Sequence, residues 1–351
     1  MGITEVLQAL QTLSETDLAK VQDYLNSLIM DSNSFETILS KKKFQNGVFC
    51  PHCNSIHIKK NGHKGTIQRF LCKDCGKTFT SRNNTITFSS KKSYYVWKKY
   101  IECMMNGFSV RKSALICGIN KDTAFIWRHK ILDAMQNMAA NVKLDGIVEA
   151  DETFFPLSYK GNHKKSISFV MPRQNRKRGK SCHKRGLSRE KVCVPCAVNR
   201  NGLSISRITN LGRVSAKDLH TAFDGRIEEN SVLVTDEMNS YLDLARTNNL
   251  ELIQLKSGKS KLGIYNIQHV NNYHSTLKHF IENFKGVSTK YLSNYLIWNN
   301  FVNYAKESYS EKTVIFADFV FTTNKKSLSR NIPLRPAIPF IVKNQKIDKP
   351  L

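Results

Sequence analysis

The sequence is poor in acidic residues and lacks a long hydrophobic run, and each shortage narrows the classes of protein to which it can belong. Only 28 of its 351 residues are Asp or Glu. No stretch approaches the ~18 consecutive apolar residues that a transmembrane helix needs. Glu5 stands where a secretory signal peptide would have a basic start followed by an apolar run. We therefore expect a cytoplasmic protein with no membrane partner.

Basic residues dominate the charge. The 54 Lys and Arg residues give a formal net charge of +26, and such an excess makes a chain repel itself unless a polyanion neutralises it. Double-stranded DNA is the partner that we expect, which would place the protein on the nucleoid, and an anionic membrane surface is the weaker alternative. Because 40% of the residues are hydrophobic, we expect globular cores rather than disorder.

Residues 1–30 have apolar side chains at helical spacing. Ser14 opens a Ser-Glu-Thr-Asp pattern that is typical of a helix start. We expect a small helical hairpin that serves either as a structural appendage or in self-association. A polar, Lys-rich joint is expected at residues 32–46.

Two Cys-x2-Cys pairs are separated by 18 residues: Cys50 with Cys53, and Cys72 with Cys75. Each pair can put two thiolates on one side of a tight turn, so that four sulfurs close a tetrahedron around Zn²⁺. The cysteines of a cytoplasmic protein stay reduced, which favours a metal site over disulfides. With four sulfur ligands the zinc would be structural. The alternatives are four unrelated thiols, or His52 and His57 as competing ligands.

Basic residues surround these cysteines, and they fit either phosphate contacts or a solvated face. They are Lys41, Lys42, Lys43, Lys59, Lys60, Lys64, Arg69, Lys73 and Lys77.

Residues 106–130 fit a helix-turn-helix. Ser109 can cap a first helix, Gly118 falls where a tight turn is needed, and Asn120 can cap a second helix. The residues expected to point outward from the second helix, toward a DNA major groove, are Lys121, Thr123, Arg128 and Lys130. A plain helical hairpin is the alternative interpretation.

Three polar residues stand at the ends of otherwise apolar elements. Asp151 and Asp236 follow strand-like runs, and Asn271 opens a helical stretch. Carboxylate and amide oxygens suit Mg²⁺ or Mn²⁺, and two such ions can promote in-line phosphoryl transfer. Helical spacing from Asn271 also brings Lys278 onto the same face, where it can bind a DNA phosphate. Each residue alone is more often a turn or cap residue than a ligand.

The order of elements strengthens the set. The sequence predicts a strand with Asp151, two further strands, a helix over Ser215 to Phe223, a strand with Asp236, another strand and a helix with Asn271. This is the ribonuclease-H-like order, with a mixed sheet.

The chain resembles bacterial insertion-sequence transposases that join an N-terminal zinc ribbon to an Asp-Asp-Asn/Glu-Lys catalytic domain. The resemblance covers roughly residues 1–305. The matching stretches are Cys50 to Phe79, Val148 to Phe155, Ser158 to Asn162, Lys184 to Ser188, Asp236, Gln268 to Ser275 and Phe284 to Leu292.

The resemblance implies that Asp151, Asp236 and Asn271 are the metal-binding triad and that Lys278 is the accompanying lysine. The chain departs from the pattern at Asn266, where such transposases often have His. A neutral Asn271 should also bind the second metal more weakly than a carboxylate would.

Residues 158–191 form a basic insertion with twelve Lys or Arg and one Glu. It is predicted either to fold along a DNA backbone or to form a solvated loop. The candidate DNA-binding residues are Arg173, Arg176, Lys177, Arg178, Lys184 and Arg185.

Two further motifs are decoys. Cys193 and Cys196 lie in a strand-like run, and only Cys182 and His183 could complete a metal site with them, so core thiols are favoured. Residues 257–260 mimic a phosphate loop but lack its first glycine, because position 253 is Ile.

Together these features predict a multidomain enzyme. The expected parts are a helical N-terminal segment (1–40), a β zinc ribbon (41–88), a helical helix-turn-helix region (89–140), an α/β ribonuclease-H-like domain (141–310) and a C-terminal tail (311–351), which we expect to be irregular after about 322.

The predicted function is a DNA transposase that acts as a homo-oligomer on DNA. It would bind the terminal inverted repeats of its element and catalyse Mg²⁺-dependent DNA cleavage and strand transfer into target DNA. The alternatives are a catalytically silent, sequence-specific DNA-binding regulator derived from a transposase, and a structure-specific nuclease.

Overall fold

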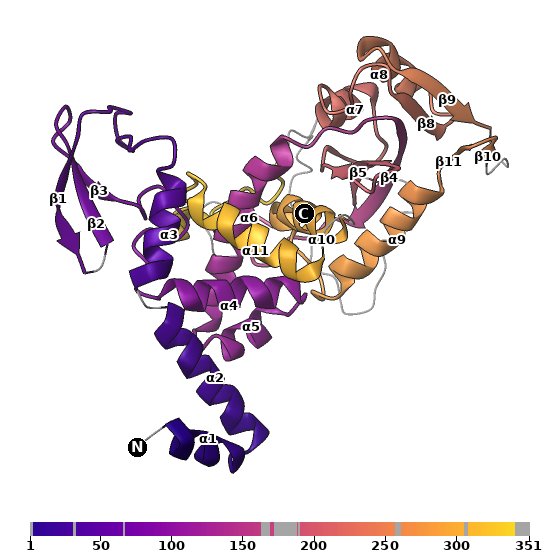
Figure 1. The fold of residues 1–351 in the computed structure, drawn as a ribbon. Coiled ribbons are helices and arrows are strands. Elements are labelled where there is room, and N and C mark those ends of the chain that lie inside the picture. Colours follow the sequence, from indigo (N-terminus) through magenta and orange to yellow (C-terminus); the bar gives the residue numbers. More distant parts are fainter. Residues whose placement is uncertain are drawn as a thin grey trace. The chain divides into compact units, whose positions relative to one another are not determined.

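The computed structural model describes residues 3–30, 33–65, 67–162, 169–171, 188, 190–256, 261–304 and 308–340 (Figure 1). The chain divides into two compact units. One unit comprises Met1–Trp127 and Thr313–Lys326, and the other comprises Arg128–Lys312 and Ser327–Leu351. None of the helices in the described part is long and apolar enough to cross a membrane.

The first unit begins with three helices, α1 (Ile3–Gln11), α2 (Glu15–Met30) and α3 (Asn33–Lys43). Ser14 accepts a hydrogen bond from the backbone N–H of Asp17 at 3.2 Å, as the capping pattern predicts. Helix α3 corrects the expectation of a polar joint at residues 32–46. Its buried Leu39 gives it an apolar contact, and three lysines at its C-terminal end suit the helix dipole.

A three-stranded antiparallel sheet follows, with the order β1 (Ile58–Lys64), β2 (Ile67–Cys72) and β3 (Thr78–Thr80). Its small core contains Phe70 and Phe79, whose rings stack at 5.5 Å, and Phe44 packs edge-on against Phe70. So few apolar side chains form a weak core, which leaves the stability of this part dependent on its four cysteines.

Three helices follow: α4 (Tyr94–Met105), α5 (Val110–Ile116) and α6 (Lys121–Ala140), and α6 belongs to this unit up to Trp127 and to the second unit from Arg128. Ser109 caps α5 through the N–H of Lys112, and the side chain of Asn120 accepts from the N–H of Asp122 at the start of α6. Trp97 of α4 stacks on Trp127 of α6 with ring centroids 3.7 Å apart. Gly118 occupies the turn at φ +58, a conformation that favours glycine.

Helix α11 (Tyr309–Thr322) was not expected from the sequence, which we took to end in a tail from residue 311. Phe316, Val320 and Phe321 are buried on one face of this helix, and Phe321 packs edge-on against Tyr94 of α4. Its apolar face therefore belongs to the core of the first unit.

The second unit contains a mixed sheet in the order β6-β5-β4-β8-β9. Its strands are β4 (Ile147–Pro156), β5 (Lys191–Asn199), β6 (Ser204–Ser206), β8 (Val232–Asp236) and β9 (Glu251–Leu255), and β7 (Asn210–Leu211) also pairs with β5. Strands β4, β8 and β9 run parallel, whereas β5 is antiparallel to β4 and to β6. Strand β4 is central in this sheet.

Helices α7 (Ala216–Phe223), α8 (Ser240–Thr247), α9 (Gln268–Glu282) and α10 (Thr289–Asn303) accompany the sheet (Figure 1). A hairpin of β10 (Lys261–Leu262) and β11 (Tyr265–Asn266) precedes α9, and a short 3-10 turn, η1 (Ser329–Asn331), follows α11. Helix α8 is absent from the sequence prediction.

The two faces of β4 meet different surroundings, because successive side chains of a strand point to opposite faces. Val148 and Ala150 enter a hydrophobic core that includes Phe223 of α7 and Leu244 of α8. Glu149 and the carboxylate of Asp151 face α9 instead, as their contacts with that helix show. The sheet therefore presents its acidic residues on the side of α9.

Candidate functional site

Asp151 and Asp236 lie on neighbouring parallel strands. The paired residues of β4 and β8 include Glu149 opposite Val234, and two further residues along each strand lead to Asp151 and Asp236. Neighbouring strands lie about 4.8 Å apart, and residues in parallel register point to the same face. The structure thus brings together two carboxylates that are far apart in the sequence.

Burial and nearby charges shift the pKa of Asp151. Burial raises the pKa of Asp151 to about 6, the negative charge of Asp236 adds to the increase, and the positive charge of Lys278 opposes it. Asp236 is exposed at the end of its strand. A divalent cation between the two carboxylates would relieve both the burial cost and their mutual repulsion.

Helix α9 supplies the remaining candidates. Asn271, His274 and Lys278 share one face, because they follow one another at spacings of three and four residues. His274 is buried, and its Nδ1 lies 3.8 Å from Oδ2 of Asp151. Burial, assisted by the positive charge of Lys278, lowers the pKa of His274 to about 4, so that the imidazole is neutral at pH 7.

Asn271 and Lys278 are exposed on α9. Lys278 is close enough for its charge to act on both Asp151 and His274. Asn271 lies about one helical turn before His274 on α9. Two carboxylates and an amide oxygen are the kinds of ligand that Mg²⁺ or Mn²⁺ prefers, and a nearby lysine suits an anionic substrate.

Two acidic residues of β4 near this site escaped the sequence analysis. Glu152 accepts a hydrogen bond from the hydroxyl of Tyr241 at 2.6 Å, and burial raises the pKa of Glu152 to about 7. Glu149 is fully buried and contacts the start of α9. Strand alternation would have placed Glu149 on the face of Asp151, but only the fold reveals its partners.

The four cysteines of the first unit converge. Cys50 and Cys75 have their sulfurs 3.6 Å apart, as do Cys53 and Cys72, and all four ligand atoms lie within 4.8 Å of one another. Four sulfurs at the ~2.3 Å zinc–sulfur distance would stand roughly 3.8 Å apart. The set therefore fits a tetrahedral Zn²⁺.

The two cysteine turns have the same backbone geometry. The N–H of Asn54 donates to the carbonyl of Cys50 at 2.9 Å, and the N–H of Gly76 donates to that of Cys72 at 3.0 Å. Asn54 and Gly76 both have a positive φ, of 60° and 68°. This repetition is what two zinc-binding turns that face each other require.

The predicted DNA-binding residues of the helix-turn-helix differ in their exposure. Lys121 is exposed, while Thr123 and Lys130 are half-buried. Arg128, however, is fully buried, with its guanidinium 5.1 Å from the ring of Trp298 and 5.5 Å from that of Phe284. The expectation that Arg128 points outward is wrong, because this part of α6 has entered the core of the second unit.

The base of the basic insertion is anchored. The N–H of Thr289 donates to the carbonyl of Ser158, and the hydroxyl of Thr289 accepts from the N–H of Ser158, both at 2.9 Å. The ammonium of Lys290 donates to the side chain of Asn162 at 3.0 Å and to the carbonyl of Pro333 at 3.1 Å. Two stretches that carry the family resemblance, 158–162 and 284–292, are thus in contact.

Several predicted residues lie outside the described part of the chain. They are Arg173, Arg176, Lys177, Arg178, Lys184 and Arg185, together with Cys182, His183 and residues 257–260. Cys193 and Cys196 are described, and both are fully buried in β5, in agreement with their interpretation as core thiols.

The sequence is similar to transposase sequences. Residues 143–301 match the family model of the ISXO2-like transposase domain. The chain is 24% identical over 263 residues to an uncharacterized protein in transposable element ISH50 of Halobacterium salinarum, and the match covers 74% of this chain and 86% of that protein. This relative is archaeal, so the bacterial origin that the resemblance to bacterial transposases implied is not confirmed.

Solved structures give a weaker likeness. A pre-cleavage Mos1 transpososome matches with a TM-score of 0.21 and 12% identity, covering 65% of this chain and 78% of that chain. The Mos1 strand transfer complex matches with a TM-score of 0.22 and 13% identity, covering 66% and 78%. Scores this low carry no argument about this chain. The two sequence matches carry the comparison: residues 143–301 are similar to the ISXO2-like transposase domain, and the predicted similarity of the chain to insertion-sequence transposases is confirmed.

Proposed function

We propose that the chain is a DDE-type DNA transposase that binds the inverted repeats at the ends of its element, cleaves there in a reaction that requires Mg²⁺ or Mn²⁺, and transfers the freed strand to target DNA. The observation that carries this proposal is the pairing of β4 with β8, which puts Asp151 beside Asp236 on the side of α9. The match to a transposase domain model over the same residues supports it.

The residues of the site divide the work. Asp151 and Asp236 would hold divalent cations, and Asn271 would supply a neutral third ligand from α9. Such ions, when bound, activate the attacking oxygen and neutralise charge on the leaving oxygen. Lys278 binds a phosphate of the DNA next to the metals and so holds the scissile bond in line. Neutral His274 packs against Asp151 without adding positive charge that would repel the cations.

The first unit supplies DNA recognition in this proposal. Zn²⁺ on the four cysteines holds the three-stranded sheet together, and the helix-turn-helix of α5 and α6 presents Lys121 and Thr123 to the DNA. Lys130, half-buried on the same helix, is a weaker candidate for a DNA contact. The net charge of +26 supports a polyanionic partner. Pairing of two element ends would require at least two copies of the chain, which act as an oligomer on DNA.

Substitution of the carboxylates tests the proposal. Asp151→Asn and Asp236→Asn keep the side-chain shape but remove the charges, so we expect cleavage of linear DNA carrying the element ends to fall at least 10³-fold. Binding of the same DNA should stay within about twofold of the wild type. Cleavage at the wild-type rate in both variants would overturn the proposed chemistry. Faster cleavage of branched DNA than of element ends would instead indicate a structure-specific nuclease.

A further inference from the structure

At the start of helix α9, Oδ1 of Asn266 accepts from the N–H of Gln268 at 3.0 Å, but no side chain of the N-cap residue reaches the next two N–H groups. This N-cap residue is Ile267, which makes no side-chain cap hydrogen bond. The backbone N–H groups of His269 and Val270 instead donate to Oε2 of Glu149, at 2.7 and 3.1 Å. A carboxylate from the central strand β4 therefore satisfies first-turn donors that every helix leaves open.

The second oxygen of Glu149 is also occupied. Oε1 lies 3.1 Å from Nη2 of Arg200 and 2.8 Å from Nδ1 of His269. Arg200 follows β5, and its guanidinium also donates to the carbonyl of Ile264 at 3.1 Å, in the turn of the hairpin before α9. Since the side chain of Glu149 is 1% exposed, Arg200 is the cation that balances a buried charge.

The spacing along the strand matches the spacing along the helix. Glu149 and Asp151 are two residues apart on one face of β4, about 6.6 Å along the strand. Glu149 contacts Val270 and Asp151 contacts His274, four residues apart on α9 and about 6 Å along its axis. Asn271 lies between these two contacts. A slip of α9 by one residue would therefore carry its amide away from Asp151.

Stability alone does not account for this arrangement. A buried ion pair adds little net stability compared with apolar residues of the same size, because removing two charges from water offsets their attraction. What a doubly engaged carboxylate does provide is direction, since charge-assisted hydrogen bonds to fixed backbone donors tolerate little displacement. The arrangement thus suits the placement of a helix more than its general stabilisation.

We propose that Glu149, held by Arg200, is a positioning residue that fixes α9 along β4 and thereby places Asn271 beside Asp151 and Asp236. The inference rests on the proposed function of these three residues as metal ligands. Glu149 itself does not bind the metal, because both of its oxygens are already engaged.

Two measurements on the full-length protein without DNA test the inference. The first is the Kd for Mn²⁺, obtained from the electron paramagnetic resonance signal of the free ion. The second is amide hydrogen exchange of α9. Glu149→Gln keeps the size of the side chain and removes its charge. We expect its Kd for Mn²⁺ to rise at least fivefold and exchange at His269 and Val270 to accelerate at least tenfold. Arg200→Met, which leaves Glu149 in place, should do the same to a smaller degree and serves if Glu149→Gln fails to fold.

Asp133→Asn is the matched control. Asp133 is a buried carboxylate bound to Arg335 at 2.6 Å and to Ser327 at 2.6 Å, on α6 rather than in the sheet. It should lower the melting temperature while leaving the Kd for Mn²⁺ and the exchange of α9 unchanged. A Glu149→Gln variant that behaves like this control would overturn the inference.

A double-mutant cycle separates this inference from the proposed function. If Glu149 acts through Asn271, Glu149→Gln should change the Kd for Mn²⁺ much less in an Asn271→Ala background than in the wild type. Full additivity of the two changes would count against the inference. Wild-type Mn²⁺ binding by Asp151→Asn would instead refute the proposed metal site, whatever Glu149→Gln does to the exchange of α9.

Discussion

Lys121 and Arg128 both lie on α6, and at the scale of single residues their surroundings assign them different roles. Lys121 is exposed at the start of the helix, whereas Arg128 is fully buried against Phe284 and Trp298. Arg128→Ala should lower the free energy of unfolding by about 2–4 kcal/mol, as removal of a large buried side chain does. Lys121→Ala should change it by less than about 0.5 kcal/mol.

Denaturant unfolding and DNA binding at several salt concentrations check this pair. Lys121→Ala should weaken DNA binding and reduce the slope of log K against log salt by about 1, because one phosphate contact is lost. Arg128→Ala should leave that slope unchanged in the folded protein. A reversed pattern, with Lys121 essential for folding and Arg128 for DNA affinity, would show that α6 does not present the residues that its burial indicates.

Asn271 offers a second prediction at this scale. Its amide brings no charge to the proposed metal site, so Asn271→Asp should lower the Mg²⁺ concentration for half-maximal cleavage about two- to tenfold, and Asn271→Ala should raise it. A Mg²⁺ titration of the cleavage rate measures both. If Asn271→Asp and Asn271→Ala shift the Mg²⁺ requirement in the same direction, Asn271 does not contribute its oxygen to the metal.

The roles of some of these residues could be predicted from the sequence, and the roles of others could not, for a physical reason. Asp151 and Asp236 each interrupt an apolar run at a strand end, which is a local signal. We predicted that Arg128 points outward because helix periodicity indicates only one buried face. Periodicity does not indicate that the residues of α6 from Arg128 onward belong to the core of the second unit. The role of Glu149 was missed for a similar reason, since its partners, Arg200 after β5 and the first turn of α9, are distant in the sequence.

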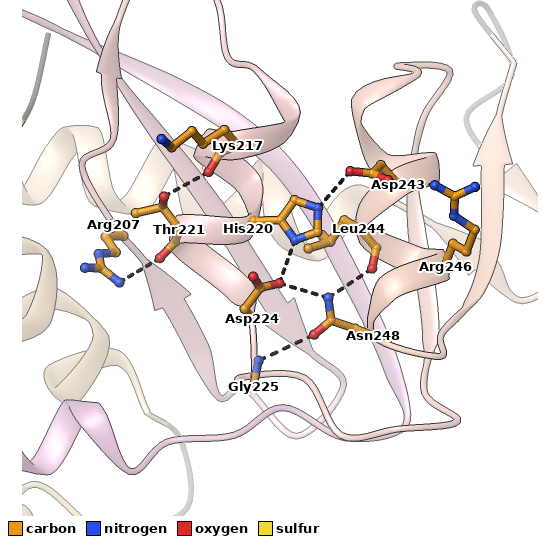
Figure 2. Close-up of polar contacts among 10 residues, drawn as sticks. All are labelled: Arg207, Lys217, His220, Thr221, Asp224, Gly225, Asp243, Leu244, Arg246 and Asn248. Atoms are coloured by element: carbon orange, nitrogen blue, oxygen red, sulfur yellow. Dashed lines mark hydrogen bonds and ion pairs between the residues drawn. The ribbon is translucent and has the colours of Figure 1, made fainter. Parts of the chain in front are cut away.

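Helices α7 and α8 illustrate the scale of the element. They are joined by a polar network, in which His220 of α7 lies between two carboxylates (Figure 2). Its Nδ1 is 2.8 Å from Asp224, its Nε2 is 3.0 Å from Asp243 of α8, and Asn248 donates to Asp224 at 3.0 Å. The hydrogen bond to Asp224, and then that to Asp243, raises the pKa of His220, although partial burial opposes the increase.

The raised pKa of His220 predicts a pH-dependent contact. The protonated imidazole stabilises the α7–α8 pair fully below its unfolded pKa of about 6.5, and this contribution is lost as pH rises through the higher folded pKa. It amounts to less than about 1 kcal/mol, because the carboxylates are half-exposed. At pH 5.5, α7 and α8 should exchange amide hydrogens faster in His220→Gln than in the wild type, and at pH 9 the two should agree. An equal difference at both pH values would contradict the role of the imidazolium.

Prediction from sequence at this scale succeeded for the elements that carry the site residues and failed for α8 and α11. Strands β4 and β8 carry Asp151 and Asp236, and α9 carries Asn271, as the predicted order of elements requires. Helix α8, with eight residues like the predicted helix α7, was missed although it buries Tyr241, Leu244 and Ala245. Helix α11 looked like part of a tail because its core partners, such as Tyr94, lie more than two hundred residues away in the chain.

At the scale of the whole molecule, the two units should differ in what holds them together. The mixed sheet of the second unit packs against a large hydrophobic core. In the first unit, the three-stranded sheet has a small core in which Phe70 and Phe79 are the buried aromatic residues. A core this small does not fold without a further constraint, and binding of Zn²⁺ by the four cysteines is coupled to folding for this reason. We therefore expect one tightly bound zinc per chain.

Removal of that zinc should disable recognition before it disables the catalytic unit. A chelator, or Cys50→Ser with Cys72→Ser, is expected to abolish amide protection in β1 to β3 and to weaken binding to element ends at least tenfold. Protection in β4, β5 and β8 should persist, because none of the four cysteines belongs to the second unit. Elemental analysis gives the zinc content, and hydrogen exchange gives the rest. Loss of protection in β4 together with β1 would mean that the two units fold as one. An intact three-stranded sheet in the zinc-free protein would show that this sheet does not need the metal to fold.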